Sequence, residues 1–367
     1  METDSPRSPA LTVVDLFAGA GGSAQGLSQA GFRVLAAVEN DSDAAATLRA
    51  NHPETKVVER DIRFVSPRTL REGLGLARGD LGLLTACPPC QGFSTLGTLD
   101  PLDERNDLVG QVWSYAREFQ PAAILLENVP GLARDPRCQR LFRQLRAVGY
   151  GLRTWVVDAA GLGVPQRRRR LIVLAARGIR RCDLPVDPRE ILPLDFLLEA
   201  PPAEEVISLA GPLERTADPV HRARRVSPKV MERLSAIPVG GSHRDLPDDL
   251  RLGCHVRLEQ QGKKGATAPY GRIRIGEPAP TMTTRCTTVS CGRFVHPTEH
   301  RGISLREAAL LQTFPPDYSF AGTYGAVERQ IGNAVPVRLA EALGLAVREV
   351  LQRVSDTEAR LARQRSD

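Results

Sequence analysis

Cys90 is the side chain best suited to covalent chemistry in this sequence. It closes a Cys-Pro-Pro-Cys motif that begins at Cys87, directly after the short apolar run 81–86. Such a run is typical of a buried parallel strand, and prolines cannot continue a sheet interior. We therefore expect Cys90 just beyond the carboxyl end of a strand, where open α/β sheets place their ligands, and interpret it as a nucleophile. The polar segment from Gln91 to about Arg105 is long enough to cover such a site.

The same motif also has the Cys-x-x-Cys spacing of redox dithiols and of half a zinc site. A zinc site needs a second pair, and Cys286 and Cys291 are separated by four residues, which fits poorly. A thioredoxin-like domain would be shorter and would carry the motif near its first strand. We predict no metal site. From the motif alone, a nucleophile and a redox or structural cysteine stay equally open.

A carboxylate occupies the corresponding place after the next buried run. The apolar residues 122–126 lead directly to Glu127, so this side chain is also expected at the carboxyl end of a strand. Strand ends often carry solvated acids. With a cysteine expected one strand away, however, we favour a catalytic acid for Glu127.

Four arginines, residues 167–170, enter another apolar run. Charged groups leading into a buried strand are costly unless they have a partner. Side chains alternate between the two faces of a strand, so Arg168 and Arg170 are expected to share a face with Gln166.

A glycine-rich turn near the amino terminus predicts a nucleotide or adenosyl cofactor. The apolar run 11–17 is followed by Gly19-x-Gly21-x-x-Ala24 and a predicted helix. Glycines let the backbone approach a ligand closely, and a helix amino terminus favours negative groups. Glu39 ends the next predicted strand, where a carboxylate can bind both hydroxyls of a ribose. Taken alone, this fingerprint fits a nicotinamide cofactor as well as an adenosyl one.

Asp61 and Ile62 follow a third predicted strand, over residues 56–58. Asp61 can accept a hydrogen bond from an adenine amino group while Ile62 packs on the ring. Their position after a strand agrees with a nucleoside site at the carboxyl edge of the sheet.

The composition, 42% hydrophobic and 25% charged residues, is that of an ordinary globular protein. No apolar run approaches the roughly 20 residues of a membrane span, and the amino terminus lacks a secretory apolar region. Seven scattered cysteines, an odd number, favour a reducing compartment, so we expect a cytoplasmic protein. The net charge is −2 over residues 1–150 and +8 over residues 151–367. A polyanion is therefore expected to meet the second half of the chain.

Six motifs, in this order along the chain, are similar to those of bacterial cytosine-carbon-5 DNA methyltransferases. Each is weak or moderate by itself, but the ordered set is specific and reaches from one end of the chain to the other. The six motifs are Phe17–Gly22, Pro89–Gln91, Glu127–Val129, Gln166–Arg170, Arg306–Pro315 and Gln330–Pro336.

The resemblance implies an α/β fold with a doubly wound, mostly parallel sheet of the S-adenosylmethionine-dependent methyltransferase type. It also implies a smaller, irregular target-recognition domain. We predict a catalytic and cofactor-binding domain over 1–177 and a target-recognition domain over 178–291. Residues 292–367 then hold the last motifs and a long helix from Asn333 to Val354 that returns to the first domain.

The resemblance also assigns roles to residues. Cys90 attacks carbon 6 of cytosine, Glu127 acts as an acid at ring nitrogen 3, and Arg168 and Arg170 hold the cytosine carbonyl or a phosphate. The expected S-adenosylmethionine contacts are Phe17, Ala18, Gly19, Gly21, Gly22, Glu39, Asn40, Asp61, Ile62, Pro89, Asn333, Ala334 and Val335. The expected DNA contacts are Gln91, Ser94, Gln166, Arg272 and Arg274.

The expected partner is double-stranded DNA, because the long basic interval 178–291 favours a reader of duplex DNA. The target base must then be flipped out of the duplex to be reached. We expect a monomer at the bacterial nucleoid, without membrane contact. Whether a separate restriction endonuclease accompanies the enzyme stays open. A tRNA-directed methyltransferase of the same superfamily is the main alternative. A nicotinamide-dependent oxidoreductase is a weaker one, since it leaves Cys90 and Glu127 without roles.

Overall fold

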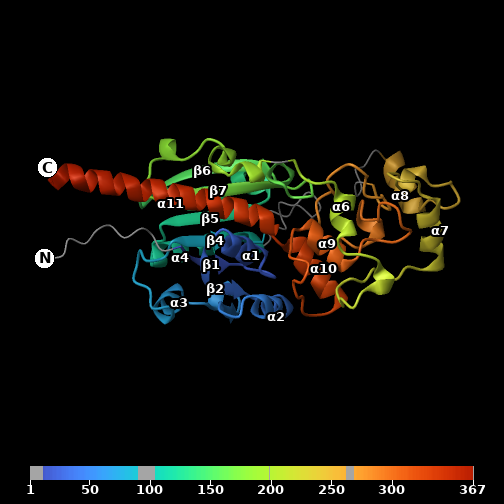
Figure 1. Ribbon diagram of the computed structural model, residues 1–367, viewed down its shortest axis with the longest axis horizontal. Coiled ribbons are helices and arrows are strands. Elements are labelled where there is room, and N and C mark those ends of the chain that lie inside the picture. The colour runs from blue at the N-terminus through green and yellow to red at the C-terminus, as the bar shows by residue number, and fades with distance from the viewer. Residues whose placement is uncertain (1–10, 90–103, 198, 262–267, 367) are drawn as a thin grey trace. The chain divides into compact units, whose positions relative to one another are not determined.

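The computed structural model describes residues 11–89, 104–197, 199–261 and 268–366. The chain divides into two compact units (Figure 1). The sheet unit comprises residues 1–158, 169–198 and 335–367, and the irregular unit comprises 159–168 and 199–334. No helix in the described residues is long and apolar enough to span a bilayer.

The sheet unit is built on seven strands in the order β3-β2-β1-β4-β5-β7-β6. All neighbours pair in parallel except β7, which runs antiparallel to both β5 and β6. The predicted doubly wound, mostly parallel sheet is confirmed. The strands are β1 (Thr12–Leu16), β2 (Arg33–Glu39), β3 (Lys56–Glu59), β4 (Leu83–Ala86), β5 (Ala123–Asn128), β6 (Tyr150–Asp158) and β7 (Arg169–Arg177).

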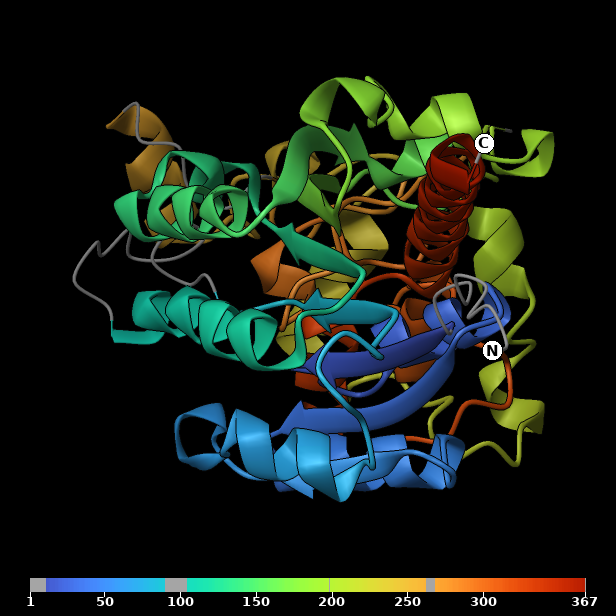
Figure 2. The ribbon, with the colours of Figure 1, turned by 90° about the vertical axis from the view of Figure 1, so that its left-hand side faces the viewer.

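Helices cover both faces of this sheet, with α4 and α5 on one face and α11 on the other (Figure 2). Local signals set their starts: Asp41 caps α2 by accepting a hydrogen bond from the Ala44 amide, and Asp135 caps α5 ahead of Pro136. The helices of the sheet unit are α1 (Gly22–Gln29), α2 (Ser42–Asn51), α3 (Pro67–Gly73), α4 (Gln111–Phe119), α5 (Pro136–Ala147) and α11 (Val337–Ser366).

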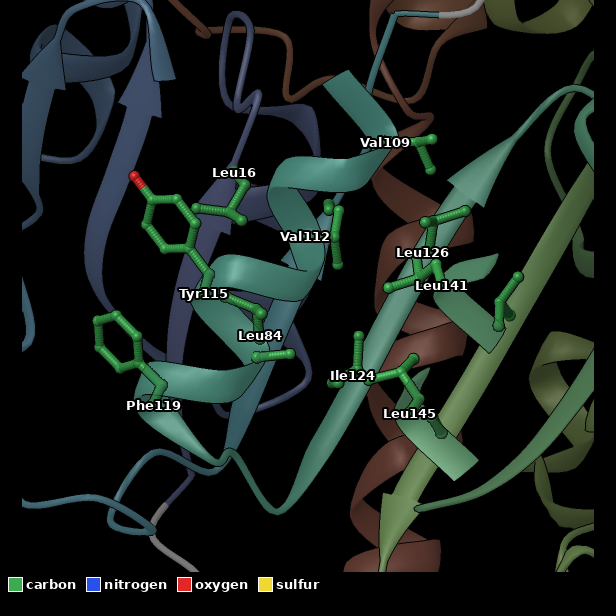
Figure 3. Close-up of a cluster of buried hydrophobic side chains, with 14 of the residues drawn as sticks. Leu16, Leu84, Val109, Val112, Tyr115, Phe119, Ile124, Leu126, Leu141 and Leu145 are labelled. Atoms are coloured by element: carbon green, nitrogen blue, oxygen red, sulfur yellow. The ribbon is translucent and has the colours of Figure 1, made fainter. Parts of the chain in front are cut away.

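The main core lies between the central strands and the helices α4 and α5 (Figure 3). Apolar side chains from the strands meet those that α4 and α5 present at helical spacing. Burying each of the larger ones contributes roughly 1.5–3 kcal/mol. The labelled members are Leu16, Leu84, Ile124 and Leu126 from the strands, Val109, Val112, Tyr115 and Phe119 from α4 and the turn before it, and Leu141 and Leu145 from α5.

On the other face, α11 crosses α1 at two glycines. A Cβ at Gly26 of α1 would collide with the Val337 carbonyl oxygen of α11, and one at Gly344 would lie 2.7 Å from the Ala30 Cβ. Arg348 adds a hydrogen bond to the Ala30 carbonyl, 2.8 Å long. The glycines therefore allow the long helix to lie directly against α1.

The irregular unit has five helices among its described residues and no strand, only isolated bridges such as Arg272 to Val295. A small apolar cluster that includes Leu234, Tyr270 and Val295 forms one core. The helices are α6 (Ala203–Ser208), α7 (Pro228–Ala236), α8 (Gly253–Gln260), α9 (Leu305–Leu311) and α10 (Tyr324–Asn333).

The division of the chain differs from the predicted domain boundaries. Residues 178–197 lie in the sheet unit, whereas 159–168 and 292–334 lie in the irregular unit. The helix predicted from Asn333 to Val354 begins later and is longer: α10 ends at Asn333, and α11 runs from Val337 to Ser366. Pro336 explains the break, because proline disfavours a helical conformation in the residue before it.

Candidate active site

The turn after β1 has the backbone that a cofactor loop requires. Gly19 and Gly21 have φ angles of 55° and 89°, and Gly21 precedes α1 in the left-handed conformation. Phe17 also has a positive φ, 61°, which is costly for a residue with a side chain. Such strain concentrates at ligand sites, and here it lies where the sequence predicted one.

Glu39 holds this turn from the neighbouring strand. Its carboxylate accepts the Gly19 amide at 2.7 Å and the Asn40 and Asp41 amides at 2.9 and 2.8 Å. Burial raises the pKa of Glu39, while these backbone donors act against the rise. The glycine turn and the acid predicted to bind a ribose are therefore in direct contact.

Asp15 is a member of this site that sequence reasoning did not include. It lies on β1 with 1% of its surface exposed, and its Oδ2 has no hydrogen-bond partner among the described residues. Burial, with the nearby charge of Glu39, raises the pKa of Asp15 to about 8, whereas a hydrogen bond from Ser23 lowers it. A charged residue inside the apolar run 11–17 was the available signal.

Asp61 and Ile62 lie at the end of β3 as predicted. Ile62 is buried, and Asp61 begins a short 3-10 turn by accepting the Arg63 amide at 2.9 Å. The guanidinium of Arg63 donates to the Asp61 carboxylate at 2.7 Å, and this hydrogen bond lowers the pKa of Asp61. The carboxylate lies beyond the carboxyl edge of the sheet.

Glu127 is held by two side chains from adjacent strands. It is the second-last residue of β5 and has 6% of its surface exposed. The Cys87 thiol donates to its Oε2 at 3.0 Å, and Arg170 of β7 forms an ion pair with its Oε1 at 2.9 Å. This pairing offsets the cost of burying the carboxylate.

Asn128 links the two strand ends through the backbone. Its Nδ2 donates to the Pro88 carbonyl at 2.9 Å, and its Oδ1 accepts the Val129 amide at 2.8 Å. The turn that follows β4 is therefore fixed to the end of β5 up to Pro89, which is half-buried. The predicted nucleophile Cys90 and the predicted DNA contacts Gln91 and Ser94 lie outside the described residues.

Gln166 and Arg168 do not share a strand face with Arg170, contrary to the prediction. β7 begins at Arg169, so the preceding residues are not subject to its alternation. Arg168 is buried and donates to the Met282 and Ala334 carbonyls, both at 3.0 Å.

Gln166 also stabilises the irregular unit through hydrogen bonds. It donates to the Leu311 carbonyl at 2.9 Å and to Gln312 at 2.7 Å, and it accepts the Met282 amide at 2.9 Å. Both side chains therefore tie residues 159–168 to the rest of that unit. In this structure Gln166 is buried, so it is not placed as a DNA contact.

Arg272, predicted as a DNA contact, is 1% exposed. Its guanidinium donates to the carbonyls of Leu234, Ile237 and His296 at 2.8, 2.9 and 3.0 Å. The described residues of this unit form no strand, which leaves many carbonyls without a ladder partner, and one arginine with five donors satisfies several. In this structure Arg272 supports the fold. The nearby Arg274 is exposed.

The remaining predicted cofactor residues lie around the junction of α10 and α11. Asn333 ends α10 and is exposed, while Ala334 and Val335 are buried. The Ala334 carbonyl accepts a hydrogen bond from Arg168.

The last predicted cofactor residue, Ala18, lies in the glycine turn after β1. It is buried and donates its amide to the Val38 carbonyl at 3.1 Å.

The sheet with its antiparallel β7, the glycine turn and the paired acid define a class, the S-adenosylmethionine-dependent methyltransferases. Within this class, the family model for C-5 cytosine-specific DNA methylases matches residues 11–349. The chain belongs to this family. It is a DNA (cytosine-5-)-methyltransferase that uses S-adenosylmethionine as its methyl donor, as the sequence predicted.

Individual relatives agree with the family assignment. Type II methylase M.HgiDII of Herpetosiphon aurantiacus is 32% identical, over 93% of this chain and 96% of its own. Type II methyltransferase M.PspPI of a Psychrobacter species is 35% identical, over 94% and 80%. A prophage-encoded E. coli protein described as a DNA modification methyltransferase shares the fold at a TM-score of 0.65 and 23% identity, covering 94% of this chain and 100% of its own. The DNA-directed prediction holds, and the tRNA-directed and nicotinamide alternatives do not.

Proposed function

We propose that this enzyme methylates carbon 5 of a cytosine flipped out of a specific duplex sequence, through a covalent bond from Cys90 to ring carbon 6. The observation that carries the proposal is the position of Glu127, which is anchored by Cys87 and Arg170 beside the turn that leads to Cys90. Carbon 5 of cytosine is a poor nucleophile. Addition of a thiolate at carbon 6 converts the ring into an enamine that is nucleophilic at carbon 5.

Glu127 is proposed to act at ring nitrogen 3, where charge develops as the thiolate adds. Arg170 holds the carboxylate in position from β7. Arg168 was predicted to act on the substrate, but its guanidinium donates to two backbone carbonyls. We therefore propose that Arg168 supports the fold rather than the reaction.

The cofactor is proposed to bind along the carboxyl edge of β1, β2 and β3. The strained glycine turn, the Glu39 carboxylate and the Asp61–Ile62 pair supply a backbone cradle, a ribose acceptor and an adenine contact. S-adenosylmethionine supplies an electrophilic methyl group to carbon 5. Asn333, Ala334 and Val335 are proposed as further contacts on the basis of the family motif.

Sequence choice is proposed to reside in residues 199–334. The described part of this interval presents exposed arginines and a lysine, and such side chains bind phosphates and guanine edges. Exposed examples are Arg225, Lys229, Arg244, Arg274 and Arg285. The buried arginines Arg168 and Arg272 keep the backbone of this unit in place.

The relatives are named as Type II enzymes, which supports a role in restriction-modification with a separate endonuclease. We further propose that the enzyme acts as a monomer in the cytoplasm, at DNA. Bisulfite sequencing of DNA from a host that expresses the chain tests the activity and its target together. We expect protected cytosines within one short sequence, and none with Cys90→Ala. Protection that persists with Cys90→Ala would contradict the assignment of the nucleophile.

A further inference from the structure

We propose that Cys87 is a positioning residue for Glu127, whose thiol holds one carboxylate oxygen while Arg170 holds the other. The inference rests on the proposed function, because that function gives Glu127 its substrate. β4 and β5 are parallel neighbours with Ala86 opposite Leu126. The next residue on each side, Cys87 just after β4 and Glu127 near the end of β5, therefore lie side by side.

The contact between these side chains is direct. The Cys87 Sγ lies 3.0 Å from Oε2 of Glu127, and Arg170 Nε lies 2.9 Å from Oε1. A thiol is a weak donor, but a hydrogen bond in a buried site is stronger than one in water. The thiol donor follows β4 and the ion-pairing guanidinium belongs to β7, so the two groups hold the carboxylate from both sides and fix its position and its rotation.

The backbone around Cys87 is itself fixed. The buried Asn128 side chain donates to the Pro88 carbonyl at 2.9 Å, which ties the residue after Cys87 to the residue after Glu127. The thiol therefore cannot move far from the carboxylate. Loss of the thiol proton donor would leave Arg170 as the anchor at one oxygen and allow the carboxylate to rotate about it.

This role differs from a redox or space-filling role in what substitutions do. Cys87→Ser keeps a donor of similar size, whereas Cys87→Ala removes it and Cys87→Val replaces it with an apolar group. A positioning role predicts that the serine variant behaves like the wild type and that the alanine and valine variants do not. A space-filling role predicts the opposite ranking of serine and valine.

The experiment measures the rate at which the full-length enzyme forms a denaturant-resistant adduct with a duplex carrying 5-fluorocytosine at the target. We expect Cys87→Ala and Cys87→Val to slow adduct formation about tenfold, the effect of losing one hydrogen bond in a buried site. Affinities for S-adenosylmethionine and for the duplex should stay within about twofold. Cys87→Ser should restore the wild-type rate.

A double-mutant cycle with Glu127→Gln identifies the partner through which Cys87 acts. If the thiol works through the carboxylate, Cys87→Ala should slow the Glu127→Gln enzyme far less than the wild type. Equal slowing in both backgrounds would overturn the proposal, as would a folded Cys87→Val enzyme that traps at the wild-type rate. A wild-type enzyme that forms no adduct would overturn the proposed function, and this inference with it. Normal trapping by the wild type and all Cys87 variants would overturn this inference alone.

Discussion

At the scale of single residues, three carboxyl groups along the sheet edge, two buried and one half-buried, are compensated in three ways. Glu127 accepts a hydrogen bond from the Cys87 thiol and forms an ion pair with Arg170. Glu39 accepts hydrogen bonds from three backbone amides. The burial of the Asp15 carboxyl group is compensated least. It accepts a hydrogen bond from Ser23, but burial, with the nearby charge of Glu39, raises its pKa to about 8. It is therefore the group whose proton should couple most strongly to folding.

Asp15→Asn tests this coupling. An acid whose pKa rises on folding binds more protons in the folded state than in the unfolded state, between its unfolded pKa near 3.8 and its folded pKa near 8. The free energy of unfolding should therefore fall as the pH rises through that window. The asparagine variant should lack this slope and gain stability relative to the wild type from pH 5 to pH 8. Thermal unfolding at several pH values measures the difference, and a constant difference across that range would contradict the account.

Arg272 and Arg274 form a matched pair for the irregular unit. Arg272→Ala leaves several buried carbonyls without a donor, so it should destabilise that unit by about 3 kcal/mol or more. Arg274→Ala should leave the melting temperature unchanged. It should instead weaken DNA binding and reduce the salt dependence of binding by about one counterion. Thermal unfolding measures the stability of each variant, and a salt titration measures its DNA binding. A destabilised Arg274→Ala variant beside a stable Arg272→Ala variant with weakened DNA binding would contradict both assignments.

The scale of elements shows why local reasoning reached the sheet edge and not the irregular unit. Apolar runs followed by a glycine or proline turn marked β1, β4 and β5, so the glycine turn, Cys87 and Glu127 could be predicted at or near strand ends. The predicted shared strand face of Gln166, Arg168 and Arg170 is wrong, because the apolar content of this stretch does not show that β7 begins only at Arg169. In the irregular unit the described residues form no strand, and the burial of Arg272 depends on carbonyls far away in the sequence.

The crossing of α1 and α11 gives a prediction at the same scale. Gly26→Ala or Gly344→Ala should force the two helices apart and cost about 1–3 kcal/mol of unfolding free energy, since overpacking is not relieved by a rigid backbone. Gly110→Ala is the control, because Gly110 has a helical φ of −66° and no atom within 4 Å of an added Cβ. The control should be neutral or slightly stabilising. Equal losses in all three variants would contradict the proposed role of the crossing.

At the scale of the whole molecule, each unit is assembled from separated segments. The sheet unit closes with α11, the last described helix, and the irregular unit includes residues 159–168 from far upstream. Motif order predicted the two kinds of domain but not these boundaries. They depend on contacts such as Arg168 with Met282, which link residues more than a hundred positions apart.

An exchange of the recognition unit tests the division. Residues 199–334 from a relative with another target should move methylation to the sequence of that relative. A matched exchange of 178–291 should give a less stable hybrid, because it cuts through both units. Genome-wide bisulfite sequencing reads the target, and an active 199–334 hybrid that methylates the original sequence would contradict the assignment.

The covalent step at Cys90 is the central claim, and trapping on 5-fluorocytosine tests it most directly. The carbon 5 proton must leave before Cys90 can be eliminated, and fluorine cannot leave that way. The wild-type enzyme should therefore form a denaturant-resistant complex with the fluorinated duplex, only when S-adenosylmethionine is present. Cys90→Ser should form none, because its hydroxyl is a far weaker nucleophile, whereas Cys87→Ser should still trap. An adduct that persists in Cys90→Ser and disappears in Cys87→Ser would contradict the account.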